Sequence, residues 1–231
     1  MSTTQLAKFG PGLKRFGNDL NPFGRGLTPL NKKAHAAARD GAVTIPTGLK
    51  LTRRAKRKAT LRLLHVANAA KHIGTLPEPG ESIHAVMKGN FDCWSLVGAI
   101  IRLANVKVDR LTIATLGFNR TNAAELVGLV DTGTVAAVDF VCSCYFKSTS
   151  ADEFGFLHGE LTARGQRIVA CRNHAKLQLF EFADGRRFVV ETSANLRSCK
   201  NVELFALHHD AALLDFHRSW VTMLIEGGDQ K

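Results

Sequence analysis

Apolar and polar positions alternate along residues 82–224 with two different periods. Some segments repeat every second residue, as in a half-buried strand, and others repeat every three or four residues, as along one face of a helix. In chain order, this pattern predicts strands at 82–88, 110–116, 135–145, 167–171, 175–182, 187–191 and 202–208, and helices at 93–104, 122–130, 152–163 and 213–224. Strands that alternate with helices are typical of an α/β sandwich with a mostly parallel central sheet.

Two segments indicate how the predicted strands pair. Residues 135–145 are almost continuously apolar, which favours a strand buried on both faces, as in a parallel sheet. Residues 183–186, with the sequence Ala-Asp-Gly-Arg, separate two short apolar runs and have the composition of a hairpin turn. We therefore expect parallel pairing in the centre of the sheet and an antiparallel hairpin over 175–191.

Positive charge is concentrated in the first third of the chain. Residues 1–75 contain 15 Lys or Arg and 2 Asp, a net charge of +13, whereas residues 76–231 contain 16 basic and 18 acidic residues, a net charge of −2. Residues 76–81, Leu-Pro-Glu-Pro-Gly-Glu, have the composition of a linker. The sequence thus predicts a basic N-terminal arm at 1–75 and an α/β domain at 76–231. This asymmetry favours a nucleic-acid partner, with DNA ahead of RNA, over an anionic membrane surface.

The arm itself divides into two parts. Residues 7–49 are rich in Gly, Pro and Asn, and we expect them to be partly disordered. Residues 52–71 contain neither Gly nor Pro and are predicted to form a helix. Its first turns carry five cations that we expect to bind nucleic acid: Arg53, Arg54, Lys56, Arg57 and Lys58. Cations there oppose the helix dipole, and a bound phosphate would relieve the repulsion. The alternative is a solvated basic face that only aids solubility.

The remaining composition is that of a globular protein. Of the 231 residues, 45% are hydrophobic and 22% are charged, and no apolar run approaches the roughly 20 residues of a membrane-spanning helix. The first residues contain no apolar stretch of signal-peptide length, so we expect a cytoplasmic protein without a membrane partner. Five cysteines without framework spacing are interpreted as reduced, mostly buried thiols.

One constellation of polar residues indicates chemistry. His174 and Lys176 are two positions apart on a predicted strand, so their side chains should share a face. Ser193 and Asn195 have the same spacing at the end of the next predicted strand, and the hairpin should bring the two pairs together. An imidazole, an ammonium, a hydroxyl and an amide in one volume suit a phosphodiester. The imidazole can attack phosphorus while the ammonium and the amide bind the non-bridging oxygens.

The same residues resemble the motif of the phospholipase D superfamily. That motif is His-x-Lys, four residues, Asp, about six residues, and Gly-Ser-x-Asn, commonly followed by Asn-x-Glu. Five positions of this sequence match it: His174, Lys176, Ser193, Asn195 and Glu203. Glu181 stands in place of the Asp, and Thr192 stands in place of the Gly. The resemblance covers roughly residues 82–225 and implies a phospholipase D-like α-β-α sandwich.

The resemblance implies a specific mechanism. Members of the superfamily use two motifs, in which one His becomes a covalent phosphohistidine and the other protonates the leaving group. This chain has one motif, so it is similar to the single-motif bacterial endonucleases, in which two chains form one shared active site. The resemblance implies a homodimeric nuclease that needs no metal or other cofactor. It also implies that Glu203 accepts the second ring N–H of His174.

Three alternatives to this interpretation remain open. The chain could be a nucleic-acid-binding module of the same fold without catalysis, or a phospholipase D-type lipid hydrolase. The motif strand could also be an ordinary half-buried strand with a His before it by chance. The sequence does not distinguish DNA from RNA, single from double strands, or internal from terminal cleavage.

Other residues that could bind a metal or act in catalysis are interpreted as structural. Alternation places Cys142 and Cys144 on one face of a core strand, without the second Cys pair that a zinc site needs. Adjacent residues of a strand point to opposite faces, which argues against a metal site at residues 208–210, His-His-Asp. His158 is expected to pack within a helix, and His84 could lie at the rim of the pocket.

Overall fold

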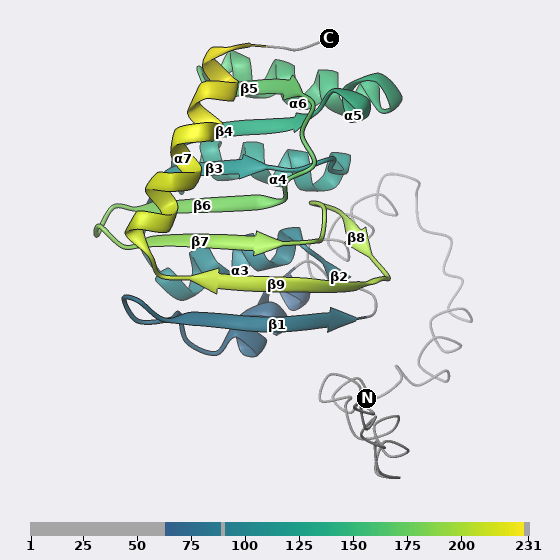
Figure 1. The fold of residues 1–231 in the computed structure, drawn as a ribbon. Helices are drawn as coiled ribbons and strands as arrows, with labels where there is room; N and C mark the ends of the chain where they lie inside the picture. Colours follow the sequence, from purple (N-terminus) through teal and green to yellow (C-terminus); the bar gives the residue numbers. More distant parts are fainter. Residues whose placement is uncertain (1–62, 89–90, 229–231) are drawn as a thin grey trace, which may run out of the picture. The chain divides into compact units, whose positions relative to one another are not determined.

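The computed structural model describes residues 63–88 and 91–228. Within these residues the sheet strands are β1 (Ser82–Lys88), β3 (Val108–Ala114), β4 (Val135–Ser143), β5 (Arg167–Cys171), β6 (Leu177–Phe182), β7 (Arg187–Thr192) and β9 (Val202–His208). The helices are α3 (Trp94–Ala104), α4 (Arg120–Asp131), α5 (Cys144–Thr149), α6 (Ala151–Ala163) and α7 (Ala211–Glu226). A small second sheet pairs β2 (Phe91–Asp92) with β8 (Ser198–Cys199). Figure 1 shows this arrangement.

The main sheet has the strand order β1-β9-β7-β6-β3-β4-β5. Parallel pairing joins β3 to β4 and β4 to β5, while the other four pairings are antiparallel. Together these pairings make five strands run in one direction and make β6 and β9 run in the other. The predicted hairpin is confirmed, since β6 and β7 pair antiparallel around the turn at 183–186. Figure 1 shows the carboxyl ends of β1, β7, β3, β4 and β5 at one edge of the sheet.

Helices cover both faces of the sheet, so the predicted α/β sandwich is confirmed. One face carries the larger core, to which α3, α4 and α6 contribute Ile100, Leu126 and Leu161. The other face is covered by α7, whose Leu214 and Val221 pack in a second core. Figure 1 shows α7 alone in front of the sheet, with the other helices behind it. Burial of these apolar residues is the main source of stability.

The parallel part of the sheet is tied together by an ion-pair network. Asp139 in β4 is only 3% exposed and accepts hydrogen bonds from Arg110 at 2.7 Å and from Arg167 at 2.6 and 2.7 Å. These two arginines lie on the flanking strands β3 and β5. A carboxylate this buried needs cationic partners, because burial of an unpaired charge is costly. The carboxylate of Asp139 raises the pKa of Arg167, mainly through the hydrogen bond.

Several element boundaries differ from the prediction. The strand expected at 135–145 ends at Ser143, because the Ser143 hydroxyl accepts a hydrogen bond from the Tyr145 amide and caps α5. Cys144 therefore begins a helix and does not share a strand face with Cys142. The strand expected at 175–182 begins at Leu177, so residues 172–176 form a loop.

The described chain begins with a helix over residues 63–73. Ala70 in this helix is buried, and the side chain of Val66 lies against Gly98 of α3, where a Cβ would meet it at 3.1 Å. The helix thus packs with the residues of the α/β domain. The five cations expected to bind nucleic acid, and the rest of the segment before residue 63, lie outside the described residues.

None of the helices among the described residues is long and apolar enough to cross a membrane. Among the described cysteines, Cys93, Cys142 and Cys171 are buried and Cys144 is partly exposed.

Candidate active site

The motif residues gather at the sheet edge where β7 ends and where β6 and β9 begin. His174 and Lys176 precede β6, Ser193 and Asn195 follow β7, and Glu203 lies at the start of β9. The antiparallel β6–β7 pairing brings the first two groups together, since the Thr192 amide donates to the Lys176 carbonyl at 3.2 Å. The antiparallel β7–β9 pairing adds Glu203 to the same edge.

His174 and Lys176 contact each other directly. Nζ of Lys176 lies 3.0 Å from Nδ1 of His174 and donates to the His174 carbonyl at 2.6 Å. We predicted that both side chains project from a strand, but they lie in the loop before β6, so this contact comes from a turn of the chain. An ammonium that donates to Nδ1 leaves the neutral imidazole with its proton on Nε2.

Lys176 is partly buried, and this affects its charge. Burial lowers the pKa of its ammonium below the usual value, while the negative charge of Glu203 acts in the opposite direction. Lys176 and Glu203 therefore interact electrostatically at this edge of the sheet. Desolvated ammonium groups bind anions more strongly than hydrated ones because the surroundings screen them less.

Asn173 holds the loop that carries His174 and Lys176. It is 8% exposed, and its amide nitrogen donates to the Thr115 carbonyl at 3.0 Å, while its oxygen accepts from the Ala175 amide at 3.0 Å. The loop is thus fixed to the end of β3. Sequence reasoning did not single out Asn173, although an Asn that bonds the backbone two residues later is a common turn signal.

Ser193 links β7 to Glu203. Its hydroxyl donates to the Glu203 carboxylate and accepts from the Leu204 amide at 2.9 Å. The resemblance implied a bond from His174 to Glu203, whereas the carboxylate oxygen Oε2 receives the Ser193 hydroxyl. Glu203 thus lies within the cluster as a hydrogen-bond acceptor.

Asn195 is oriented by the backbone of a distant segment. Its side-chain oxygen accepts from the Leu116 amide at 3.2 Å, in the loop after β3. Its side-chain nitrogen has no hydrogen-bond partner within residues 63–88 and 91–228, so two N–H donors are available to a ligand. After Asn173, the Leu116 amide is the second site group that the sequence pattern did not reveal. A backbone amide is present at almost every residue, so residue identity does not indicate it.

The two departures from the family motif have structural explanations. The Thr192 hydroxyl donates to the Leu204 carbonyl at 2.7 Å and accepts from the Ala194 amide at 3.1 Å, so it fastens the turn that presents Ser193. Glu181 accepts from Arg218 of α7 at 2.7 Å and anchors that helix to β6. Glu181 therefore supports the fold at a distance from the cluster.

A groove of about 520 Å³ adjoins the cluster along β7, β9 and β1. Ser193, Thr192, Leu204, Val86 and His84 are among its lining residues. His84 therefore lies on the wall of this groove, as the sequence allowed.

The residues interpreted as structural have ordinary partners. His208 contacts Ser82 and Glu191, whereas His209 contacts the Pro77 carbonyl, so the two rings use different partners. The His158 ring packs 5.4 Å from the Phe154 ring. Within the part of the chain that the structure describes, no three His, Cys, Asp or Glu side chains are arranged to hold a metal ion.

No protein-family model and no curated protein matches the sequence of this chain. Nuc, a phospholipase D family member from Salmonella typhimurium, is similar in structure with a TM-score of 0.47 and 15% identity over 64% of this chain and 97% of Nuc. Polyphosphate kinase from Porphyromonas gingivalis gives a TM-score of 0.48 and 14% identity, over 70% of this chain and 29% of the kinase. The archaeal chromatin protein TrmBL2 gives 0.40 and 16%, over 79% of this chain and 65% of TrmBL2.

Proposed function

We propose that this chain is a metal-independent phosphodiesterase that cleaves nucleic acid, DNA in preference to RNA, in the cytoplasm. The observation that carries the proposal is the contact between His174 and Lys176 at an exposed sheet edge, with Ser193 and Asn195 beside them. The set combines a nucleophile with donors for the phosphate oxygens, as this chemistry requires.

Phosphate binding changes the partners of His174. A non-bridging oxygen attracts the ammonium of Lys176 away from Nδ1, and the free donors of Asn195 bind a second oxygen. The neutral imidazole then carries its proton on Nδ1. This N–H donates a hydrogen bond to a carboxylate, for which Glu203 is the candidate. Nε2 is left with its lone pair toward phosphorus.

The reaction proceeds in two displacements. Nε2 of His174 attacks phosphorus, so a P–N bond forms while the P–O bond to the leaving group breaks. The leaving oxygen takes its proton from the protonated imidazole of the partner's His174. Water then attacks phosphorus of the phosphohistidine, so a P–O bond forms while the P–N bond to Nε2 breaks. The water gives its proton to the partner's imidazole, which restores both rings. The cationic and amide donors of two copies stabilise the charge of the transition state.

The shared site requires a homodimer, and an exposed apolar surface supports this. Val86, Val202 and Leu204 are 55%, 59% and 62% exposed, on the face of β1 and β9 that borders the groove beside Ser193. Exposed apolar residues in one patch are typical of interfaces. We propose a second copy as the occupant, because one chain provides a single His174 and the reaction uses two.

The decisive experiment measures phosphodiester cleavage in EDTA by the full chain and by His174→Asn. We expect the wild type to cleave DNA and His174→Asn to lose at least a thousandfold in kcat, while a matched His158→Asn variant stays near wild type. Loss of wild-type cleavage in EDTA would disprove the metal-independent mechanism. Unchanged DNA binding without any cleavage would instead support the non-catalytic module, and cleavage of phospholipid vesicles but not DNA would support the lipid hydrolase.

A further inference from the structure

Ion pairs with carboxylates hold six of the ten arginines in residues 76–231: Arg110, Arg164, Arg167, Arg186, Arg187 and Arg218. Of the other four, two lie beside the candidate site. Arg172 and Arg197 are exposed and have no carboxylate partner among the described residues. Arg172 is two residues before His174, and Arg197 is two residues after Asn195. Unpaired guanidinium groups in these positions remain available for an anion.

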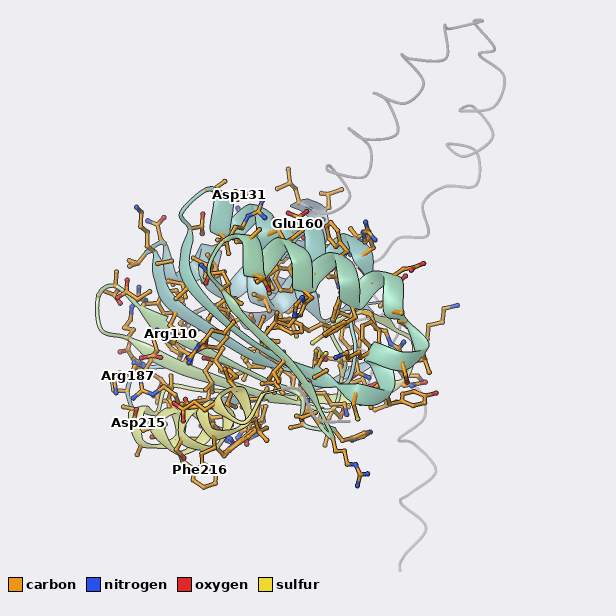
Figure 2. The ribbon with its side chains drawn as sticks, turned by 90° about the horizontal axis from the view of Figure 1, so that it is seen from above. Arg110, Asp131, Glu160, Arg187, Asp215 and Phe216 are labelled. Carbon is orange, nitrogen blue, oxygen red and sulfur yellow. The ribbon has the colours of Figure 1, made fainter. Side chains whose placement is uncertain are left out.

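Two exposed lysines extend this set along the same edge. Lys88 ends β1, and Lys200 lies between β8 and β9; neither has a carboxylate partner within the described part of the chain. Figure 1 shows the small strand β8 at the same edge as the arrowheads of β1 and β5. Paired charges lie at the other edge, where Figure 2 labels Arg110, Arg187 and Asp215 together.

The strand order places cations on both sides of the candidate nucleophile. Lys88 is the last residue of the first strand of the sheet, Lys200 precedes the second strand, and Arg172 follows the seventh. The loop with His174 enters β6, the fourth and central strand. At about 4.8 Å per strand, the distance from β1 to β5 along this edge is roughly 29 Å. This distance is several times the length of one phosphodiester group.

We infer that Lys88, Lys200, Arg197 and Arg172 form a phosphate track, and that the substrate is a nucleic-acid strand whose phosphates extend in both directions from the scissile one. This inference rests on the proposed function and adds the substrate's extent and internal cleavage. A phospholipid offers a single diester and would leave most of the track unused. The track binds backbone phosphates, so it positions the strand without selecting its sequence.

The binding test uses full-length His174→Asn, so that no cleavage interferes. The Arg172→Gln/Arg197→Gln double variant is compared with Arg102→Gln/Lys107→Gln, which removes two exposed cations from the opposite edge, where α3 ends and β3 begins. For duplex DNA, the slope of log K against log salt should become shallower by about 1.8 in the track variant and stay unchanged in the control. Equal slopes in both variants would overturn the track.

The cleavage test separates the track from the chemistry. Here the Arg172→Gln/Arg197→Gln substitutions are made in the wild-type chain, which keeps His174. This variant should lose at least tenfold in kcat/KM on DNA but keep wild-type kcat on bis(p-nitrophenyl) phosphate, a small diester. Covalently closed circular DNA should be cut. If circular DNA resists cleavage while linear DNA is degraded, internal cleavage is overturned.

The two proposals can fail separately. If neither DNA nor the small diester is hydrolysed but the salt slope still changes, the proposed function fails and the track stands as a nucleic-acid site. If the small diester is hydrolysed and the slopes stay equal, the track fails and the chemistry stands.

Discussion

Nζ of Lys176 lies within hydrogen-bond distance of both Nδ1 and the carbonyl oxygen of His174, at 3.0 and 2.6 Å. The Lys176 ammonium therefore has two acceptors on one residue. Such an arrangement keeps a partly buried cation in place at a cost in folding free energy, as is common for groups that serve a reaction.

Replacement of Lys176 should separate activity from stability. Because burial lowers the pKa of Lys176 below its ordinary value, the unfolded chain holds this proton more tightly than the folded chain. The Lys176 ammonium therefore lowers the free energy of unfolding at pH 7. This destabilisation disappears as the pH rises from the folded-state pKa through 10.5, because the amine is then neutral in both states. Lys176→Met should abolish cleavage and have a Tm at pH 7 equal to or above wild type. Calorimetry across pH 7–10.5 measures this, and a Tm well below wild type at pH 7 would contradict it.

Replacement of Asn173 should weaken both the loop and catalysis. Asn173→Ala removes hydrogen bonds to Thr115 and Ala175 from a buried position, which should lower the free energy of unfolding by about 1–3 kcal/mol. Since the loop positions His174, kcat should fall while KM changes little.

Asn173→Asp serves as the matched variant, because its oxygen can still accept from the Ala175 amide while the donor to Thr115 is lost. It should retain more kcat than Asn173→Ala. Denaturant unfolding and steady-state kinetics measure both effects, and equal kcat for wild type and Asn173→Ala would show that the loop needs no such anchor.

The side chain of Thr192 should be required in this chain, although the family motif has Gly there. Thr192→Gly removes hydrogen bonds to Leu204 and Ala194 and adds backbone freedom, so stability should fall by about 1–2 kcal/mol. Activity should not exceed that of the wild type. Thr192→Ser keeps the hydroxyl and should remain within about 0.5 kcal/mol in a thermal or denaturant melt; a Gly variant that is both more active and as stable would contradict this account.

The hydroxyl of Ser193 should matter through Glu203. Ser193→Ala leaves Leu204 N–H and the Glu203 carboxylate without this partner, so kcat should fall about tenfold and stability by about 1 kcal/mol. Ser219→Ala, which removes an exposed hydroxyl that bonds the Phe216 carbonyl in α7, is the control and should be neutral. Kinetics that do not differ between the two variants would remove Ser193 from the site.

Much of the fold could be predicted from periodicity, because burial imposes it directly. The apolar run at β4 identified a strand with neighbours on both sides, and the turn at 183–186 identified the β6–β7 hairpin. The end of β4 could not be placed, because the cap that Ser143 provides to α5 depends on a local competition between strand and helix. That β6 and β9 run against the other strands depends on tertiary pairing, which periodicity does not encode.

The candidate site was predictable as residue types and less so as geometry. The spacing of His174 and Lys176 suggested a shared strand face, but their contact arises in a loop held by Asn173. The backbone amide of Leu116, which orients Asn195, has no signature in residue identity. Contacts of this kind depend on segments about 80 residues apart and require coordinates.

If two copies share one active site as proposed, the exposed apolar surface of β1 and β9 makes the reaction depend on protein concentration. Under the shared-site proposal, a solitary copy leaves Val86, Val202 and Leu204 wetted and lacks a proton donor for the leaving oxygen. Association obeys mass action, so the active fraction rises steeply with the amount of protein made. At low concentration the protein would be monomeric and inactive toward the nucleic acid of its own cell. Cleavage would begin only at concentrations at which the dimer forms.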